Sequence, residues 1–160
     1  MGKASQFLLS KAWPDVSISI RKTMASNKGK NTKPELLLRS SLHALGYRFW
    51  LHDRKLPGTP DIIFSGRRKV IWLHGCFWHA HLGCRFATTP KTRADYWIPK
   101  LARNRERDAE HADRLQLMGW RSLVVWECEM KSMEAVEARM KSFLGPTRLA
   151  KRCPFGMSPV

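Results

Sequence analysis

Three cysteines and one histidine have the residue types and spacing of ligands for a single metal ion. Cys76, His81 and Cys84 follow one another at spacings of five and three residues, and Cys128 comes after a later apolar segment. Thiolates and imidazoles bind Zn²⁺ in tetrahedral sites, and a site filled by four protein ligands is structural because no position is left for water. We expect such a site to pin an irregular loop to the end of a core strand. Buried free cysteines beside a surface histidine are the alternative.

A carboxylate and a second histidine border the two apolar segments before that cluster. Asp61 follows Pro60 and precedes the segment 62–64, and His74 ends the segment 70–73. If the two segments pair as a hairpin, both side chains can converge on one divalent cation. A carboxylate is a hard oxygen ligand of the kind that Mg²⁺ prefers. An aspartate that only stabilises a turn is the alternative, because such residues are common.

The composition indicates a basic protein with an anionic partner. Among 160 residues, 29 are Lys or Arg and 13 are Asp or Glu, which gives a net charge of +16 with neutral histidines. This excess favours binding to a polyanion, most commonly nucleic acid. Seven Trp and seven Phe beside two Tyr suggest that some rings stack on bases. We find no transmembrane or secretory segment and expect a cytoplasmic protein, whose cysteines are reduced or metal-bound.

Hydrophobic periodicity predicts a mixed sheet flanked by helices, in the order α-β-β-β-α-β-α. Helices are expected over 32–45, 103–118 and 132–143, and strands over 47–51, 62–64, 70–73 and 120–126. The first helix begins at a capping-box pattern, Thr32 with Glu35 three residues later. Residues 75–92 have no clean period, and we expect a long functional loop there.

The two ends of the chain differ from this central part. Residues 1–31 are expected to form a basic, flexible arm whose lysines, Lys28 and Lys30 among them, lie along a phosphate backbone; a solvated tail without function is the alternative. Residues 32–145 are expected to form the folded domain. Residues 146–160 are expected to be a weakly ordered tail in which Cys153 is a spare thiol.

Four blocks of residues resemble the very-short-patch repair (Vsr) endonucleases. Their order and spacing agree from about Arg21 to Phe143. The blocks are Leu56-Pro57-Gly58-Thr59-Pro60-Asp61, His74-Gly75-Cys76-Phe77-Trp78-His79, Asn104-Arg105-Glu106-Arg107-Asp108 and Val125-Trp126-Glu127-Cys128. The resemblance implies an α/β fold like that of type II restriction endonucleases, with a structural zinc loop. It also implies a nick in double-stranded DNA on the 5′ side of the thymine in a T·G mismatch, which arises by deamination of 5-methylcytosine.

The resemblance also implies catalytic roles. Asp61 would bind Mg²⁺, and His79 would be the general base that activates water, with Asp108 orienting its ring. His74 would contact the region of the scissile phosphate, and Glu35 would act at the edge of the site through water or metal. Imidazole is a suitable general base near neutral pH, which agrees with the role of His79. Without the resemblance, Asp108 would belong to a solvated helix face.

The same resemblance assigns the zinc ligands and a DNA wedge. The zinc ligands would be Cys76, His81, Cys84 and Cys128. Phe77, Trp78 and Trp97 would insert into DNA beside the mismatch, where unstacking costs least. Adjacent aromatics in a polar loop usually mark a binding surface. Trp97 fits a core position equally well.

Three positions depart from the family pattern. Leu73 stands where family members often carry Thr, which is tolerable if that position acts through its backbone. Leu82-Gly83 adds one residue before Cys84, and Ala80 replaces a histidine of the loop.

From the four blocks together we expect a nicking endonuclease, a monomer, with T·G-mismatched DNA and mismatch-repair proteins as partners. The alternatives are a non-catalytic zinc-stabilised nucleic-acid-binding module and a restriction-type nuclease that acts on matched DNA.

Overall fold

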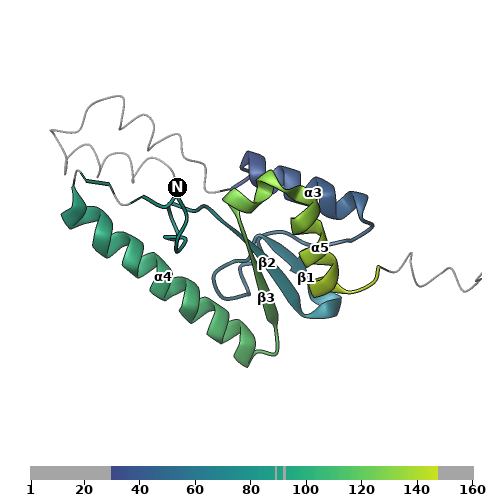
Figure 1. Cartoon of the computed structure of the whole chain (residues 1–160). Coiled ribbons are helices and arrows are strands. Elements are labelled where there is room, and N and C mark those ends of the chain that lie inside the picture. Colours follow the sequence, from purple (N-terminus) through teal and green to yellow (C-terminus); the bar gives the residue numbers. More distant parts are fainter. Residues whose placement is uncertain (1–29, 89, 92, 148–160) are drawn as a thin grey trace, which may run out of the picture. The chain divides into compact units, whose positions relative to one another are not determined.

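The computed structural model describes residues 30–88, 90–91 and 93–147, and its centre is a three-stranded mixed sheet (Figure 1). The strands are β1 (Ile62–Phe64), β2 (Lys69–His74) and β3 (Arg121–Trp126), in that spatial order. β1 and β2 are antiparallel, whereas β2 and β3 are parallel. The predicted mixed sheet with flanking helices is therefore confirmed.

The hairpin between β1 and β2 forms where the sequence predicts it. A 3-10 turn over Ser65–Arg67 is followed by Arg68 in the left-handed region, with φ of 50°, and Arg68 N–H donates to the Ser65 carbonyl. This tight reversal places Ile62 opposite Ile71. The parallel pairing of β2 with β3 requires a long crossover, which helix α4 provides.

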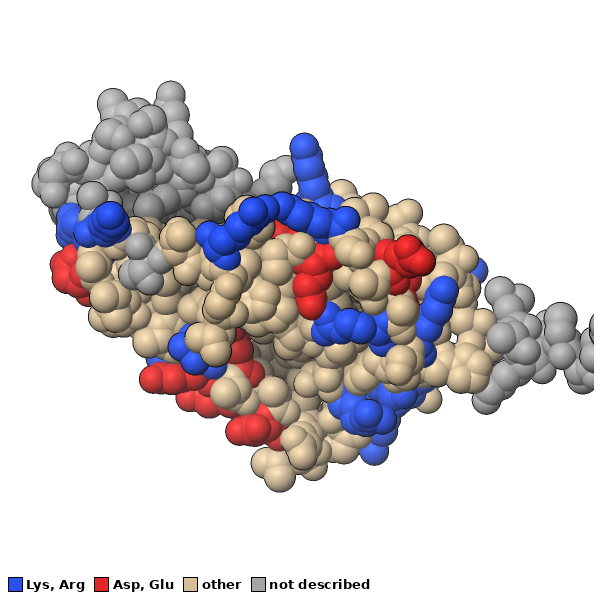
Figure 2. All heavy atoms as spheres, in the orientation of Figure 1, with Lys and Arg blue, Asp and Glu red and all other residues tan. Residues whose placement is uncertain are grey.

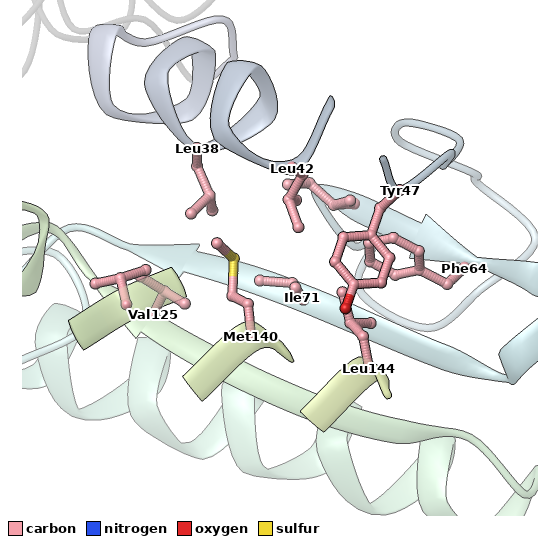
Figure 3. Close-up of a cluster of buried hydrophobic side chains, with 10 residues drawn as sticks. Leu38, Leu42, Tyr47, Phe64, Ile71, Val125, Met140 and Leu144 are labelled. Carbon is pink, nitrogen blue, oxygen red and sulfur yellow. The ribbon is translucent and has the colours of Figure 1, made fainter. Parts of the chain in front are cut away.

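Two helices cover one face of the sheet and enclose the main apolar core (Figure 3). They are α3 (Lys33–Ala44) and α5 (Met133–Leu144), close to the predicted ranges. Leu38 and Leu42 of α3 meet Met140 of α5 above Ile71 and Val125 of the sheet. Every one of these five side chains is fully buried, so the helices are fixed to the sheet by apolar packing.

Helix α4 (Ala94–Leu117) covers the other face of the sheet and is longer than predicted. It begins nine residues before the predicted start at Arg103 and contains Pro99, which lacks the N–H of a helical hydrogen bond. The burial of Trp97 and Leu101 stabilises this first part of the helix. The helix ends as predicted at Gly119, whose φ of 76° favours glycine.

The predicted strand over residues 47–51 is wrong. The structure has a single β-bridge there, in which Trp50 and Ile63 exchange two hydrogen bonds of 2.9 Å. β1 is only three residues long, and the chain turns away at His52, which has a φ of 50°. Tyr47 is nonetheless buried, and its hydroxyl donates to the Gly145 carbonyl at 2.7 Å. The alternation of apolar residues therefore marks burial here and not a ladder of hydrogen bonds.

β3 is only partly buried, and Val125 is its one fully enclosed residue. The chain divides after Lys33, and the elements that form the sites below belong to the unit from Pro34 onward. Lys30 is described and exposed, whereas Lys28 and Cys153 lie outside the described residues. None of the helices described here has the length and apolar character needed to span a lipid bilayer.

Candidate active site and metal centre

The four predicted zinc ligands converge in space. The ligand atoms of Cys76, His81, Cys84 and Cys128 all lie within 4.8 Å of one another. His81 Nδ1 is 3.6 Å from Cys76 Sγ and 3.4 Å from Cys128 Sγ. Tetrahedral coordination with usual Zn–S and Zn–N lengths separates such atoms by about 3.5 Å. The cluster therefore fits a zinc ion, which it would hold as a closed structural site.

The parallel strands explain why ligands that are far apart in the sequence meet. His74 and Trp126 pair at the ends of β2 and β3, and Cys76 and Cys128 each follow two residues later. Cys128 lies in a 3-10 helix, Glu127–Lys131. Both thiols therefore lie at the same edge of the sheet.

The loop between β2 and α4 supplies the other two ligands, His81 and Cys84. His81 N–H donates to the Cys76 carbonyl at 3.0 Å, and Cys84 N–H donates to the His81 carbonyl at 3.2 Å. Gly83, which precedes Cys84, has a φ of 71°, a conformation that glycine adopts readily. Cys76, Cys84 and Cys128 are free thiols, and burial raises the pKa of Cys76 to about 12. A cation bound by these thiols would stabilise the Cys76 thiolate.

Asp61 lies just before β1, and its carboxylate faces the end of β2. The backbone N–H of Leu73 donates to Asp61 Oδ2 at 2.8 Å. This contact uses the backbone of Leu73, so the departure from Thr does not affect it. Burial raises the pKa of the Asp61 carboxyl to about 6; the Leu73 hydrogen bond opposes that shift and the charge of Glu35 adds to it. A divalent cation would offset the cost of two neighbouring carboxylates, so the residues fit Mg²⁺.

His74, His79 and Asp108 form a compact group beside Asp61. The rings of His74 and His79 are stacked, with centroids 3.8 Å apart and an interplanar angle of 7°. His79 Nδ1 lies 2.5 Å from Asp108 Oδ2, and an N–H at Nδ1 donates to this carboxylate. In a neutral imidazole this tautomer leaves Nε2 able to accept a proton. The arrangement is that of a general base whose ring is held by a carboxylate.

The electrostatics of the group favour neutral His74 and ionised Asp108. Burial, aided by the charge of His79, lowers the pKa of His74 to about 4. For Asp108, burial alone would raise the pKa, but the hydrogen bond and charge of His79 outweigh it and keep the pKa below its usual range. At neutral pH His74 is therefore an uncharged hydrogen-bonding group.

Helix α4 holds the loop that carries His79. Asn104 Nδ2 donates to the Trp78 carbonyl at 2.9 Å, and Asp108 lies one helical turn further on. The two contacts fix the backbone and the ring of adjacent residues from one face of the helix. The sequence does not reveal this role of Asn104, because an asparagine among charged residues is equally typical of an exposed helix face.

The histidine group opens into a hollow of about 290 Å³ between α4 and the sheet. Figure 2 shows the surface hollowed there, with acidic side chains gathered along α4. The polar and aromatic residues lining it include Trp72, His74, His79, Arg105, Asp108 and His111. Solvent can therefore reach His79.

Glu35 is buried on α3, and its charge reaches Asp61. Its Oε2 accepts a hydrogen bond from Arg39 Nη2 at 2.7 Å, and the same Nη2 lies 3.1 Å from His52 Nε2. Arg39 belongs to none of the sequence motifs described above. The i, i+4 spacing of the two opposite charges was the available signal.

The three predicted wedge residues pack together. Phe77 lies 5.1 Å from Trp78 and 5.2 Å from Trp97, measured between ring centroids, in edge-to-face contacts. Trp97 is buried, with 7% of its surface exposed, whereas Phe77 and Trp78 are half-buried. Lys100 Nζ lies 5.3 Å from the Trp97 ring centroid and 5.8 Å from that of Trp78. One aromatic group thus joins a buried ring to two half-buried ones.

Comparison with known proteins agrees with this geometry. A family model described as DNA mismatch endonuclease Vsr matches residues 17–85. The chain is 51% identical over 127 residues to the type II nicking enzyme V.XorIIP of Xanthomonas oryzae, covering 79% of this chain and 93% of the relative. It is 42% identical over 113 residues to the DNA mismatch endonuclease Vsr of Escherichia coli, covering 71% of this chain and 72% of the relative. It is 39% identical over 111 residues to the type II nicking enzyme V.NmeAIP of Neisseria meningitidis, covering 69% of this chain and 79% of the relative.

Proposed function

The chain belongs to the Vsr family of DNA mismatch endonucleases, a family of DNA nicking enzymes, and on this premise we propose that its own substrate is a T·G mismatch. The nick falls on the 5′ side of the mismatched thymine and initiates very short patch repair. The observation that carries this proposal is the position of the aromatic group. Trp78 adjoins His79 in the sequence and packs on Phe77 and Trp97. A step between DNA base pairs that these rings open therefore lies next to His79, the proposed general base.

Mismatch selectivity follows from the cost of opening a base step. Inserting a ring between base pairs costs a few kcal/mol of stacking, and the cost is least at a mismatch. Phe77 and Trp78 are half-buried, whereas the buried Trp97 packs against both of their rings. Lys100, close to two of the rings, supplies a cation for the neighbouring phosphate. A weakened T·G step therefore accepts the wedge more readily than a paired step.

Hydrolysis of the phosphodiester divides among five residues. Asp61 would hold Mg²⁺, and Glu35 would act at the edge of the site through water or the metal. When bound, Mg²⁺ supplies charge neutralisation at the phosphate. His79 removes a proton from the attacking water at Nε2, while Asp108 holds the ring through Nδ1 and stabilises the imidazolium that forms. His74, neutral at physiological pH, hydrogen-bonds in the region of the scissile phosphate.

The remaining basic residues bind the DNA backbone. The net charge of +16 predicts strong, salt-dependent attraction to phosphates. We assign Lys28 and Lys30 to this role in the N-terminal arm. The Cys76, His81, Cys84 and Cys128 cluster holds a structural zinc ion that fixes the loop bearing Phe77, Trp78 and His79.

A nick in fully paired DNA is the second candidate function. Two of the relatives above are named type II nicking enzymes, and that name specifies no mismatch. The non-catalytic alternative is set aside, because the family consists of nicking endonucleases.

The test compares end-labelled duplexes that carry one T·G pair in varied flanking sequence with matched T·A duplexes, in the presence of Mg²⁺. We expect one nick 5′ of the mismatched thymine and little cleavage of the T·A controls. Asp61→Asn should abolish the nick and keep DNA binding, whereas the exposed Asp113→Asn on α4 should retain both. Equal cleavage of the T·A and T·G duplexes would refute mismatch specificity and favour the second candidate.

A further inference from the structure

Trp126, the last residue of β3, lies between the zinc cluster and the histidine group. Its indole is parallel to the ring of the zinc ligand His81, with an interplanar angle of 2° and centroids 3.9 Å apart. The His74 ring meets the same indole edge-on, at 75° and 5.3 Å. His74 in turn stacks on His79 at 3.8 Å. Three consecutive ring contacts thus connect the metal centre to the proposed general base.

We propose that Trp126 is a positioning residue, which transmits the fixed orientation of His81 in the zinc site to the stacked His74 and His79 rings. The proposal rests on the proposed function only for the role of His79; the coupling between the rings stands by itself. It assigns the zinc site a catalytic consequence in addition to holding the loop, because loss of the ion would free the His81 ring that faces the indole.

The backbone gives the indole little freedom to move. Trp126 N–H donates to Glu129 Oε2 at 2.8 Å, and Arg139 holds the other oxygen of the same carboxylate in a short ion pair. Glu129 lies in the 3-10 helix that also carries the zinc ligand Cys128. The backbone of Trp126 is therefore anchored to the same short element as one zinc ligand, and its indole is stacked on another.

The ring geometry explains why a tryptophan suits this position. A metal-binding histidine needs its ring orientation fixed by neighbouring groups, since that orientation directs the ligand nitrogen at the metal. His81 presents Nδ1 to the two sulfurs, and the flat indole constrains the plane of its ring. An aliphatic side chain fills space but does not select a ring plane. Only an aromatic residue combines the parallel contact with the edge-on contact to His74.

The first measurement monitors histidine ring signals by NMR in the full chain labelled uniformly with ¹⁵N and ¹³C, at fixed pH and without DNA. Zinc is withdrawn stepwise with a chelator, and the amide signals of β1 report whether the fold persists. We expect the ring signals of His74 and His79 to shift together with those of His81 while the β1 signals stay in place. In Trp126→Leu, zinc withdrawal should move the His74 and His79 signals much less.

The second measurement compares nicking by Trp126→Leu, Trp126→Phe and the control Trp120→Leu. Trp120 precedes β3 at its other end and packs on the second apolar cluster, away from both sites. A small misplacement of a reacting group can reduce turnover about 100-fold, so we expect kcat of Trp126→Leu to fall by about 10- to 100-fold with little change in KM. Trp126→Phe should recover most of the loss, and Trp120→Leu should keep the wild-type rate.

Two results would overturn the proposal. One is a wild-type protein in which zinc withdrawal leaves the His74 and His79 signals in place while those of His81 move. The other is a folded Trp126→Leu that matches Trp120→Leu in kcat. If Trp126→Leu does not fold, Trp126→Phe and the wild-type zinc titration still decide the question. Coupled ring signals without any nick at T·G would refute the proposed function and leave this inference intact.

Discussion

Replacing Asp61 by asparagine should make the Mg²⁺-free protein more stable and catalytically inactive. Burial raises the pKa of this carboxyl from 3.8 to about 6, with Glu35 adding to the shift. The folded protein therefore holds the proton more tightly than the unfolded chain does. The stability that the protonated Asp61 carboxyl contributes is fully present below about pH 4. It is lost as the pH rises to about 6, because the unfolded chain releases this proton at a lower pH than the folded protein does. Asparagine resembles the protonated acid and avoids this loss.

The pKa values set the size of the effect. A difference of about two pKa units corresponds to about 3 kcal/mol at neutral pH, since each unit is worth 1.36 kcal/mol. The amide NH₂ of the new side chain needs a hydrogen-bond acceptor, which reduces the gain by about 1 kcal/mol. We therefore expect the free energy of unfolding of Asp61→Asn to exceed that of the wild type by about 1 to 3 kcal/mol at pH 7.5. For a domain of this size the difference is on the order of 5 to 10 °C in Tm.

The assay is thermal or urea unfolding of the zinc-loaded protein in Mg²⁺-free buffer at several pH values between 4 and 8. The difference between Asp61→Asn and wild type should be about 1 kcal/mol in favour of the wild type at pH 4, and it should change sign and reach its full value above pH 6. Asp113→Asn is the matched control, because this carboxylate is exposed on α4. Added Mg²⁺ should raise the Tm of the wild type alone, by mass action.

A stability difference that does not depend on pH, or a destabilised variant at pH 7.5, would refute this reasoning. Either result would mean that the Asp61 carboxylate is already compensated in the metal-free protein. The assignment of Asp61 as a cation ligand would then lose its electrostatic support, although nicking assays would still test it directly.

Three further changes test other parts of the site. His79→Ala should reduce the nicking rate by about 10²- to 10⁴-fold with DNA affinity retained in a binding assay, since a general base is lost; unchanged nicking would contradict that role. Cys128→Ser should lower the bound zinc below one ion per chain by metal analysis and lower the Tm, because a structural zinc site contributes to folding; full zinc retention would exclude Cys128 as a ligand. Gly58→Ala should cost about 1 to 3 kcal/mol in urea unfolding, because φ is +73° and an added Cβ would lie 2.5 Å from the His111 ring. Gly66→Ala is its control, where an added Cβ meets nothing within 4 Å, and equal stability of the two variants would contradict the prediction.

Local sequence patterns predicted most of the elements. The hairpin around Ser65–Arg67 and the end of α4 at Gly119 follow from turn residues that act over three or four positions. The strand over 47–51 failed because alternation reports which side chains are buried, whereas a ladder also needs a partner strand of equal length. The start of α4 was missed because Trp97 and Leu101 stabilise a segment that Pro99 would otherwise weaken.

The sequence by itself determined the ligand types, the local spacing of Cys76, His81 and Cys84, and a charge suited to DNA. Only the tertiary structure decided which distant residues meet. The parallel pairing of β2 with β3 carries Cys128 to Cys76, and the position of α4 brings Asp108 to His79. These contacts depend on strand direction and helix placement, which arise from packing of the whole core. For the same reason no local pattern contains the ring contacts of Trp126 or the burial that shifts the pKa of Asp61.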